Sequence, residues 1–283
     1  MHFELSHEQT MLVDTVRQFV EKELYPHEDQ VEKDDAVDPD LAAEIQQKAL
    51  DIGIYAANMP EQYGGAGMDT LAYVLALEEI AKIDASAAVI MSAHNSLVLY
   101  GLNEYGTEEQ KQKYLIPLAK GEKLGAFALS EPEAGSDASS QHTTAEDMGD
   151  HYLVNGTKNW ITNGGTASTY LVMAQTDAAK GHKGINVLIV EKGMPGFEVG
   201  PKEKKMGIRG SDTHTLLFND VKVPKENLLP GVTGLKGPLS CLNSARYGIS
   251  WGVIGAAIDC HCTAVQYSKE RKQFGKPIAS YQL

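Results

Sequence analysis

A run of eleven residues, Ala128 to Ala138 (ALSEPEAGSDA), brings together groups that could hold a polar ligand. The apolar residues at its start predict a strand that leaves the core, and Pro132 ends the hydrogen-bonding ladder of that strand. Gly135 permits a tight turn with exposed amides. Backbone N–H groups and two hydroxyls would then converge on one spot, which suits a phosphate, a carbonyl or the edge of a heteroaromatic ring. Gly-Ser-Asp alone is common in surface turns, so the prediction of a ligand site depends on the length of the whole run.

A second run, KNWITN at 158–163, follows an Asn-Gly dipeptide at 155–156. Asn-Gly between two apolar runs is typical of a type I′ hairpin. We therefore expect a hairpin whose second strand carries Trp160 and Thr162 on the same face. On composition alone, such a tryptophan is an aromatic of the core and such a threonine an ordinary strand residue.

Two more runs complete a set of four: KMGIRGSDT at 205–213, followed by VPKENLL, and ERKQFGKPI at 270–278. With these motifs in this order, the whole chain resembles the acyl-CoA dehydrogenase flavoproteins. The resemblance implies FAD as cofactor and an acyl-CoA thioester as substrate. It also implies oxidation to the trans-2-enoyl-CoA, with hydride transfer from the β-carbon to flavin N5.

The resemblance implies that Trp160 packs on the flavin and that the Thr162 hydroxyl meets N5. The isoalloxazine ring of a flavin needs a flat apolar surface to pack on. It also needs a donor whose hydrogen bond strengthens as negative charge develops on the ring. Arg271 and Phe274 would reach the FAD of a partner chain, where the fork of an arginine suits the pyrophosphate. Without the resemblance, Arg271 is a solvated cation at a helix end. The other implied FAD contacts are Phe127, Leu129, Ser130, Ser136, Ile161 and Gln282.

The implied substrate contacts are Ser136, Asn243 and Arg246, which match positions along the channel for CoA and the acyl chain. Asn243 stands where the family has an aspartate, so one acceptor has become an amide. Arg246 beside Tyr247 could equally be a packed interface residue.

The proton beside a thioester is a poor acid, so the reaction needs a carboxylate base within contact distance. In most members of the family this glutamate lies in the C-terminal bundle, beyond the position of Leu283. In a minority it immediately precedes the arginine that matches Arg246, and Ala245 stands there in this sequence. Glu131 is not the base in the family. We therefore expect a chain that is C-terminally truncated and lacks the usual catalytic glutamate.

Two other functions stay open. A non-catalytic FAD- or CoA-ester-binding protein, or a scaffold, could keep the front half of the fold and bind without reducing flavin. An oxidase or a flavin monooxygenase could use the same fold, although Ser130 and Thr162 favour the dehydrogenase by analogy.

The resemblance also bears on the acyl group. Residues 1–229 look most like short-chain, butyryl-type dehydrogenases, and the segment from Cys241 on looks more like glutaryl-CoA dehydrogenase. A dicarboxylate would need a cation at about Ala88, and none is present there. We expect a short straight-chain acyl-CoA.

The pattern along the chain predicts a multidomain protein with helices, then strands, then helices. Residues 1–120 are expected to form an all-α domain, 121–229 a β-barrel domain of hairpins, and 230–283 the start of an incomplete C-terminal helical bundle. This order matches the acyl-CoA dehydrogenase fold. Losing most of the bundle would expose an apolar helix face, so we expect poor solubility or non-native association.

Local signals support the helical part. Capping boxes are expected at Ser6 with Gln9 and at Thr107 with Gln110. We also expect a helix at 40–52 that stops at Gly53.

Three further features belong to the helical domains. The glycine-rich stretch 63–67 reads as a connector, because no strand precedes it and no Lys-Ser or Lys-Thr follows it. Asp69 can cap the next helix, which is apolar nearly all round and should be buried. Gly248, Gly252 and Gly255 suggest close helix–helix approach near the C-terminus.

The charge and the cysteine content limit which classes of partner and which cell compartment are expected. The 283 residues carry a formal net charge of −13, which argues against nucleic acid and anionic membranes as general partners. No apolar run reads as long enough to span a bilayer, and the N-terminus lacks the pattern of a signal peptide. Three cysteines do not make a disulfide framework, and the stretch 260–262 (CHC) reads as a packed helical segment rather than a zinc site.

From these features we expect a cytoplasmic protein, with the mitochondrial matrix as the alternative. The family resemblance implies a homo-oligomer, a dimer of dimers at full length. It also implies electron-transfer flavoprotein as the acceptor of electrons.

Overall fold

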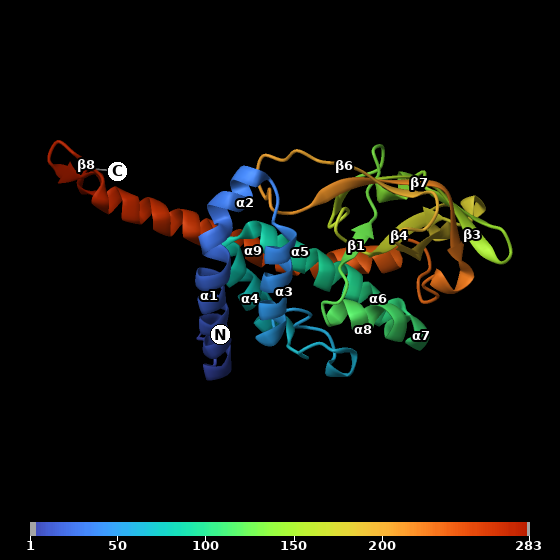
Figure 1. The fold of residues 1–283 in the computed structure, drawn as a ribbon, viewed down its shortest axis with the longest axis horizontal. Coiled ribbons are helices and arrows are strands. Elements are labelled where there is room, and N and C mark those ends of the chain that lie inside the picture. Colours follow the sequence, from blue (N-terminus) through green and yellow to red (C-terminus); the bar gives the residue numbers. More distant parts are fainter. Residues whose placement is uncertain (1–3, 282–283) are drawn as a thin grey trace.

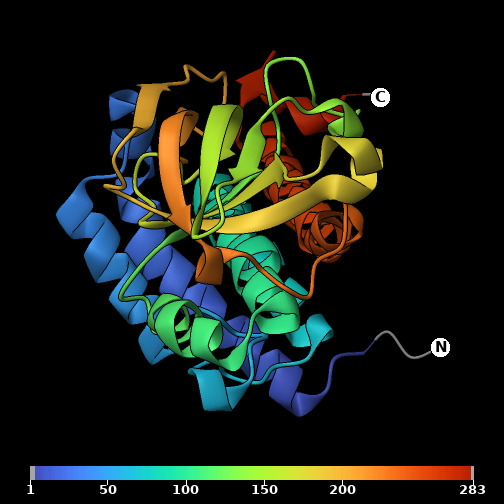
Figure 2. The same ribbon diagram turned by 90° about the vertical axis from the view of Figure 1, so that its right-hand side faces the viewer.

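The computed structural model describes residues 4–281, which form a helical layer, a curled sheet and one long helix (Figure 1). In the view of Figure 2 the strands gather on one side of the molecule and most helices on the other. The helical layer contains α1 (His7–Phe19), α2 (Glu28–Asp34), α3 (Pro39–Asp51), α4 (Thr70–Ile83), α5 (Ala85–Ser92), α6 (Tyr100–Tyr105), α7 (Glu108–Gln110) and α8 (Ile116–Ala119). Short π-helical stretches join several of them, at Val20–Leu24, Ala93–Leu99 and Lys111–Leu115.

The predicted helix starts are confirmed. Ser6 closes a capping box on α1, with the Gln9 N–H donating to Ser6 Oγ at 3.2 Å and the Ser6 N–H to Gln9 Oε1 at 2.9 Å. A second box, built by Thr107, starts α7. Asp69 accepts from the Ala72 N–H at 2.7 Å and so satisfies an otherwise free donor of α4. Most of α4 is buried, as its apolar composition predicts.

The expected helix at 40–52 is α3, which begins one residue earlier and ends one residue earlier. The carboxylate of Asp38 caps it by accepting from the N–H groups of Asp40 and Leu41 at 3.0 and 3.2 Å. Gly53 follows the helix with a φ of 75°, the left-handed conformation that glycine adopts without a steric penalty.

The strands form one curled seven-stranded sheet with the order β1-β4-β2-β3-β7-β6, and β5 pairs with β4. Two pairs, β1 with β4 and β2 with β4, are parallel, and the other pairs are antiparallel. Inside the curl, Phe197 lies between Tyr170 and Phe218, with ring centroids 4.8 and 5.2 Å away. The strands are β1 (Gly125–Ala128), β2 (Thr144–Asp147), β3 (His151–Thr162), β4 (Thr169–Gln175), β5 (Ile185–Glu191), β6 (Phe197–Lys202) and β7 (Thr213–Pro224).

The predicted hairpin turn at Asn155-Gly156 is wrong, because β3 runs through both residues without reversing. The amide of Asn155 is used across the sheet instead: its Nδ2 donates to Asp220 Oδ1 at 3.0 Å, and its Oδ1 accepts the Asp220 N–H at 2.8 Å. Gly156 sits at a register shift, and a Cβ there would lie 2.4 Å from Thr143 Oγ1. The glycine thus permits a close approach of two strands within a bulge.

The last long element is α9 (Lys236–Glu270), which packs against α4 through the predicted glycine face. A Cβ on Gly255 would lie 2.2 Å from the carbonyl oxygen of Glu78, and one on Gly248 would lie 2.8 Å from Leu77 Cδ1. The close approach of helices is therefore confirmed, since neither position has room for a side chain.

This contact gives a stability prediction with an internal control. Gly255→Ala is expected to destabilise the protein by about 2 kcal/mol, because the new methyl group must push the backbone of α4 away. Gly252→Ala places its Cβ 3.7 Å from Ala81 Cβ, an ordinary contact, and should stabilise α9 by up to about 1 kcal/mol through helix propensity. Urea unfolding of both variants checks the difference. Equal effects of the two substitutions would contradict the packing argument.

Beyond Gly255 the helix α9 leaves the rest of the molecule and ends in a small hairpin of β8 (Lys272–Gln273) and β9 (Lys276–Pro277) (Figure 1). The CHC stretch lies on this part. It is helical as predicted, but Cys260 and Cys262 are exposed, so the prediction that it is packed is wrong. Large exposed apolar side chains of α9 are Leu239, Tyr247, Ile249, Val253, Ile254, Ile258 and Tyr267.

Two helical stretches, Ala85–Tyr105 and Lys236–Glu270, are long and apolar enough to cross a membrane by length and composition alone. The expectation that no run reaches this length is therefore wrong. In the first stretch 56% of the apolar window is buried, as in the core helix of a folded domain, whereas in the second only 11% is buried. Close packing in the interior accounts for the composition of the first.

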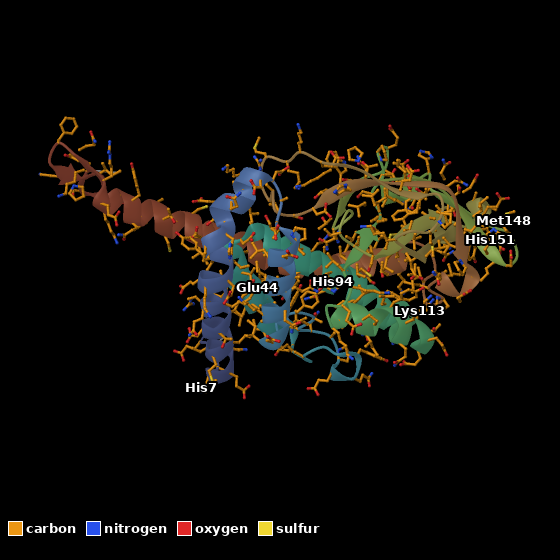
Figure 3. All side chains as sticks on the ribbon, in the orientation of Figure 1. His7, Glu44, His94, Lys113, Met148 and His151 are labelled. Atoms are coloured by element: carbon orange, nitrogen blue, oxygen red, sulfur yellow. The ribbon has the colours of Figure 1, made fainter. Side chains whose placement is uncertain are left out.

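His94 joins the helices to the sheet (Figure 3). Its Nε2 lies 3.1 Å from the carbonyl oxygen of Leu118, and its Nδ1 accepts the N–H of Gly125 at 3.2 Å. These partners require a neutral ring with the proton on Nε2, since a proton on Nδ1 would face another donor. Complete burial agrees with this and lowers the pKa of His94 from 6.5 to about 4.

We expect His94 to make the fold acid-sensitive. Folded His94 binds a proton more weakly than unfolded histidine, so its contribution is intact above pH 6.5 and is lost as the pH falls toward 4. The loss amounts to about 3 kcal/mol of unfolding free energy at the acid end. Urea unfolding across this range checks it. His94→Asn should flatten the slope and the exposed His182→Asn should not; an unchanged slope in His94→Asn would contradict the assignment.

Candidate functional site

The end of β3 turns a large aromatic ring toward solvent. Trp160 has a φ of 61°, at a register shift between Lys158 and Ile161. This left-handed residue interrupts the alternation of the strand, and the indole is 59% exposed, whereas Ile161 is buried at 2%. Thr162 follows, half-buried. The strand therefore presents an indole and a hydroxyl at its accessible side, and Ile161 can meet a ligand only through its main chain.

The loop after β1 lies beside this strand end. The N–H of Asn159 donates to the carbonyl oxygen of Ser130 at 2.8 Å, and Glu131 and Ala134 exchange two backbone hydrogen bonds that close a tight turn. A Cβ on Gly135 would meet nothing within 4 Å, so the turn borders open space. Among the described residues, the N–H groups of 135–137 have no acceptor within the chain. The predicted turn with exposed amides is present.

The residues assigned to the flavin ring thus come together on one edge of the sheet. Phe127 and Ser130 are half-buried, Leu129 is buried, and Ser136 is exposed. Hydroxyls, free N–H groups and a flat apolar ring are the donor set and the wall that an isoalloxazine requires, so these residues fit the flavin of FAD.

A buried ion pair lies behind this edge, between Lys158 and Glu131. Lys158 is fully buried, and its ammonium donates to Glu131 Oε1 at 2.7 Å. The carboxylate also accepts the N–H groups of His142 and Thr143 at 2.5 and 3.0 Å. Lys158 beside it lowers the pKa of Glu131, against the effect of burial. The carboxylate is buried and already accepts three hydrogen bonds, and that Glu131 is not the base stays a prediction from the family resemblance.

The burial of Lys158 and its pairing with Glu131 were not predicted from the sequence. The signal was available in the motif itself, since Lys158 stands at an inward-facing position of a strand. A lysine is almost never fully buried unless it is paired, so its place in the strand implies a buried acidic partner.

The residues assigned to the adenine and pyrophosphate lie far from Trp160. Arg271 follows the last residue of α9, and Phe274 is 94% exposed in the β8–β9 hairpin. A helix of 35 residues spans about 50 Å, and Figure 1 places the hairpin at the opposite end of the molecule from β3. One chain does not bring these residues to the indole. Gln282 lies outside the described residues.

The residues assigned to the substrate lie on the first half of α9. Asn243 and Arg246 are exposed, and the guanidinium of Arg246 donates to Asn243 Oδ1. Ala245 between them is buried and carries no ionisable group. The match with a glutamate position therefore supplies no base in this part of the chain.

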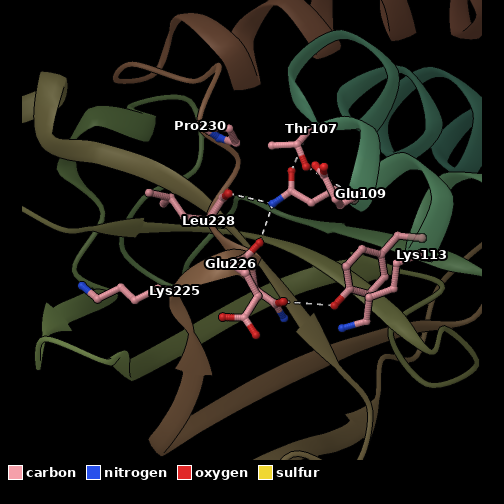
Figure 4. Close-up of a pocket in the computed structure, with 10 residues that line it drawn as sticks. Thr107, Glu109, Lys113, Lys225, Glu226, Leu228 and Pro230 are labelled. Carbon is pink, nitrogen blue, oxygen red and sulfur yellow. Dashed lines mark hydrogen bonds between the residues drawn. The ribbon is translucent and has the colours of Figure 1, made fainter.

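A hollow of about 410 Å³ lies elsewhere, where α7 and the following turn meet the chain after β7 (Figure 4). Gln110 Nε2 donates to the carbonyl oxygens of Glu226 and Leu228 at 2.7 and 2.8 Å. The Tyr114 hydroxyl donates to Asn227 Oδ1 at 3.1 Å. None of the assigned site residues lines this hollow, and its buried polar groups serve to join the helical layer to the sheet.

Three family models match successive parts of the chain. They describe the N-terminal domain of acyl-CoA dehydrogenase at residues 6–122, the middle domain at 126–221 and the C-terminal domain at 233–283. The matched parts cover the helical layer, the sheet and α9.

Known proteins agree with the family models over the length of the chain. A short-chain specific acyl-CoA dehydrogenase of Clostridium acetobutylicum is 44% identical over all of this chain, which spans 74% of that protein. Among solved structures, the butyryl-CoA dehydrogenase of Megasphaera elsdenii has a TM-score of 0.92 at 44% identity, covering all of this chain and 74% of that one.

Two further solved structures bear on the cofactor and on electron transfer. A glutaryl-CoA dehydrogenase of Mycobacterium smegmatis in complex with FADH2 has a TM-score of 0.92 at 35% identity, covering 98% of this chain and 69% of that one. A chain from a study of the electron transferring flavoprotein of Acidaminococcus fermentans has a TM-score of 0.94 at 45% identity, covering 100% and 73%. The family models, the relatives and the fold agree: the chain belongs to the acyl-CoA dehydrogenase family.

Proposed function

We propose that this protein is an FAD-dependent dehydrogenase that oxidises a short-chain acyl-CoA thioester to the trans-2-enoyl-CoA. The single observation that carries the proposal is the 59% exposed indole of Trp160 beside Thr162, on a chain with 44% identity to short-chain enzymes. When bound, FAD supplies the acceptor for the hydride that leaves the β-carbon of the substrate.

The residues around Trp160 would hold and orient the flavin. The indole forms the apolar wall, and the Thr162 hydroxyl is a donor at the ring edge that strengthens as charge develops. Phe127, Leu129, Ser130 and Ile161 contribute mainly main-chain groups. Because the edge is built from β1, β3 and the loop between them, its geometry is fixed by the sheet.

The substrate would lie between this edge and α9. Ser136 reaches both ligands from the exposed turn, and Asn243 and Arg246 supply an amide and a cation from the helix. Ala88 is buried and apolar, at the position where a distal carboxylate would need a cation. A short monocarboxylic acyl chain fits this composition better than a dicarboxylic one.

Two chains would complete each site. Arg271 and Phe274 lie beyond the end of α9, far from their own sheet, which supports the proposal that they reach the FAD of a partner, in a dimer and in a dimer of dimers. Electron-transfer flavoprotein is the proposed electron acceptor, as the study of the Acidaminococcus protein supports. The division at residues 1–120, 121–229 and 230–283 and the cytoplasmic or mitochondrial compartment remain predictions.

The alternative is a protein of this family that binds FAD and CoA esters without catalysis. It draws on two observations in residues 4–281: Glu131 is committed to Lys158, and position 245 holds an alanine. Position 245, which matches the base position of a minority of the family, therefore lacks a carboxylate, and the carboxylate of Glu131 is already paired.

Anaerobic addition of butyryl-CoA to the FAD-loaded protein separates the two functions. With the full chain restored, so that a carboxylate base is supplied, a dehydrogenase bleaches the visible absorbance of the flavin, and Thr162→Val should slow the bleaching roughly 100-fold through the lost hydrogen bond. A non-catalytic protein shows a perturbed flavin spectrum without bleaching. A protein that takes up no FAD at all would contradict both.

A further inference from the structure

Three acceptors surround the buried ammonium of Lys158. It donates to the carbonyl oxygen of Leu129 at 3.0 Å, to Glu131 Oε1 at 2.7 Å and to Gln141 Oε1 at 3.0 Å. All three N–H donors of the lysine are therefore used, and no water is needed to satisfy it. Together these contacts tie the loop after β1 to the end of β3, two residues before Trp160.

The contact with Leu129 has a direct electrical consequence. The carbonyl of Leu129 and the N–H of Ser130 belong to one peptide group, and a cation on the oxygen polarises the N–H at the other end. Among the described residues, the Ser130 N–H has no acceptor within the chain. Ser130 itself is half-buried, between the buried residues Leu129 and Glu131.

A purely structural role does not explain this pair. Taking two charges out of water is costly, and a well-packed apolar pair of similar volume is often as stable or more stable. Burial lowers the pKa of Lys158 to about 8, while Glu131 opposes the shift. The lysine therefore remains mainly charged at neutral pH. Its counter-charge, the carboxylate of Glu131 at 2.7 Å, also accepts the N–H groups of His142 and Thr143, which share its negative charge.

We propose that Lys158 is a positioning residue whose charge, acting through the Leu129–Ser130 peptide, favours the reduced flavin and so raises the reduction potential of the cofactor. The inference rests on the proposed function. A reduced flavin carries more negative charge, and a donor strengthened by a nearby cation stabilises it more than the oxidised ring. Glu131 sets the size of the effect, because it partly neutralises the ammonium.

The test uses the FAD-loaded protein and chemical reduction against a reference dye, without substrate. Lys158→Met should weaken the preference for reduced over oxidised flavin roughly tenfold, which lowers the potential by about 30 mV for this two-electron couple. Glu131→Gln should shift it in the opposite direction, because the cation loses its counter-charge. The exposed Lys222→Met is the matched control and should leave the potential unchanged.

The two variants are expected to shift the reduction potential in opposite directions. This distinguishes an electrostatic role of Lys158 from simple loosening of the loop after β1. Shifts of both variants in the same direction, no shift in either, or loss of FAD from both would overturn the proposal. Should Lys158→Met fail to fold, the Lys158→Met/Glu131→Leu double variant leaves no lone buried charge and is expected to show the lowered potential. An unmodified protein that binds no FAD would instead contradict the proposed function.

Discussion

Replacing Trp160 with alanine is expected to weaken FAD binding roughly 30-fold, which corresponds to about 2 kcal/mol. Trp160 is a large apolar residue at the edge of the sheet and is 59% exposed to solvent. Its removal takes away the wall against which the flavin packs but leaves no cavity in the core. Titration of the protein with FAD, followed by flavin fluorescence, measures the loss.

The matched control is Tyr25→Ala, which removes an aromatic ring of almost equal exposure, 60%, from the helical layer. It should bind FAD like the unmodified protein. The unfolding midpoint of Trp160→Ala should also stay unchanged, because alanine accepts the positive φ at a cost similar to that of tryptophan. Unaltered FAD affinity in Trp160→Ala would place the flavin elsewhere.

Replacing Arg271 with alanine is expected to weaken FAD binding at least tenfold. The guanidinium is exposed and forms no ion pair in the described part of the chain, so its fork is free for a phosphate. A charge-assisted contact of this kind contributes about 1.5–3 kcal/mol. The same FAD titration measures the loss.

Lys269→Ala removes an exposed cation from the same helix end and serves as the control, with only a small effect expected through long-range charge. Equal losses in the two variants would mean that Arg271 acts through general charge and not through a specific contact.

Much of the fold was predictable because several signals in this chain are local. Ser6, Thr107 and Asp69 cap their helices as their side-chain chemistry predicts, and Gly255 lies where two helices touch. The motif around Ser130 and Gly135 forms the expected turn, since proline fixes φ and glycine adds no side chain that would hinder a turn.

Other features depended on partners distant in sequence. Asn155-Gly156 has the composition of a hairpin turn, yet Asp220, more than sixty residues later, forms two hydrogen bonds with the asparagine amide, and β3 continues through both residues. Trp160 departs from plain alternation because β3 bulges where it pairs with β7. The exposure of Cys260 could not be predicted either, because helix propensity does not determine which face of a helix packs against another element.

We propose that each flavin lies on Trp160 of one chain and under Arg271 of another. Co-expression of Trp160→Ala and Arg271→Ala chains with different tags, followed by isolation of the doubly tagged dimer, tests it directly. One of the two sites in such a dimer combines both intact residues, so we predict about one tightly bound FAD per dimer, whereas each variant alone binds FAD weakly. A doubly tagged dimer with no tightly bound FAD would contradict the claim.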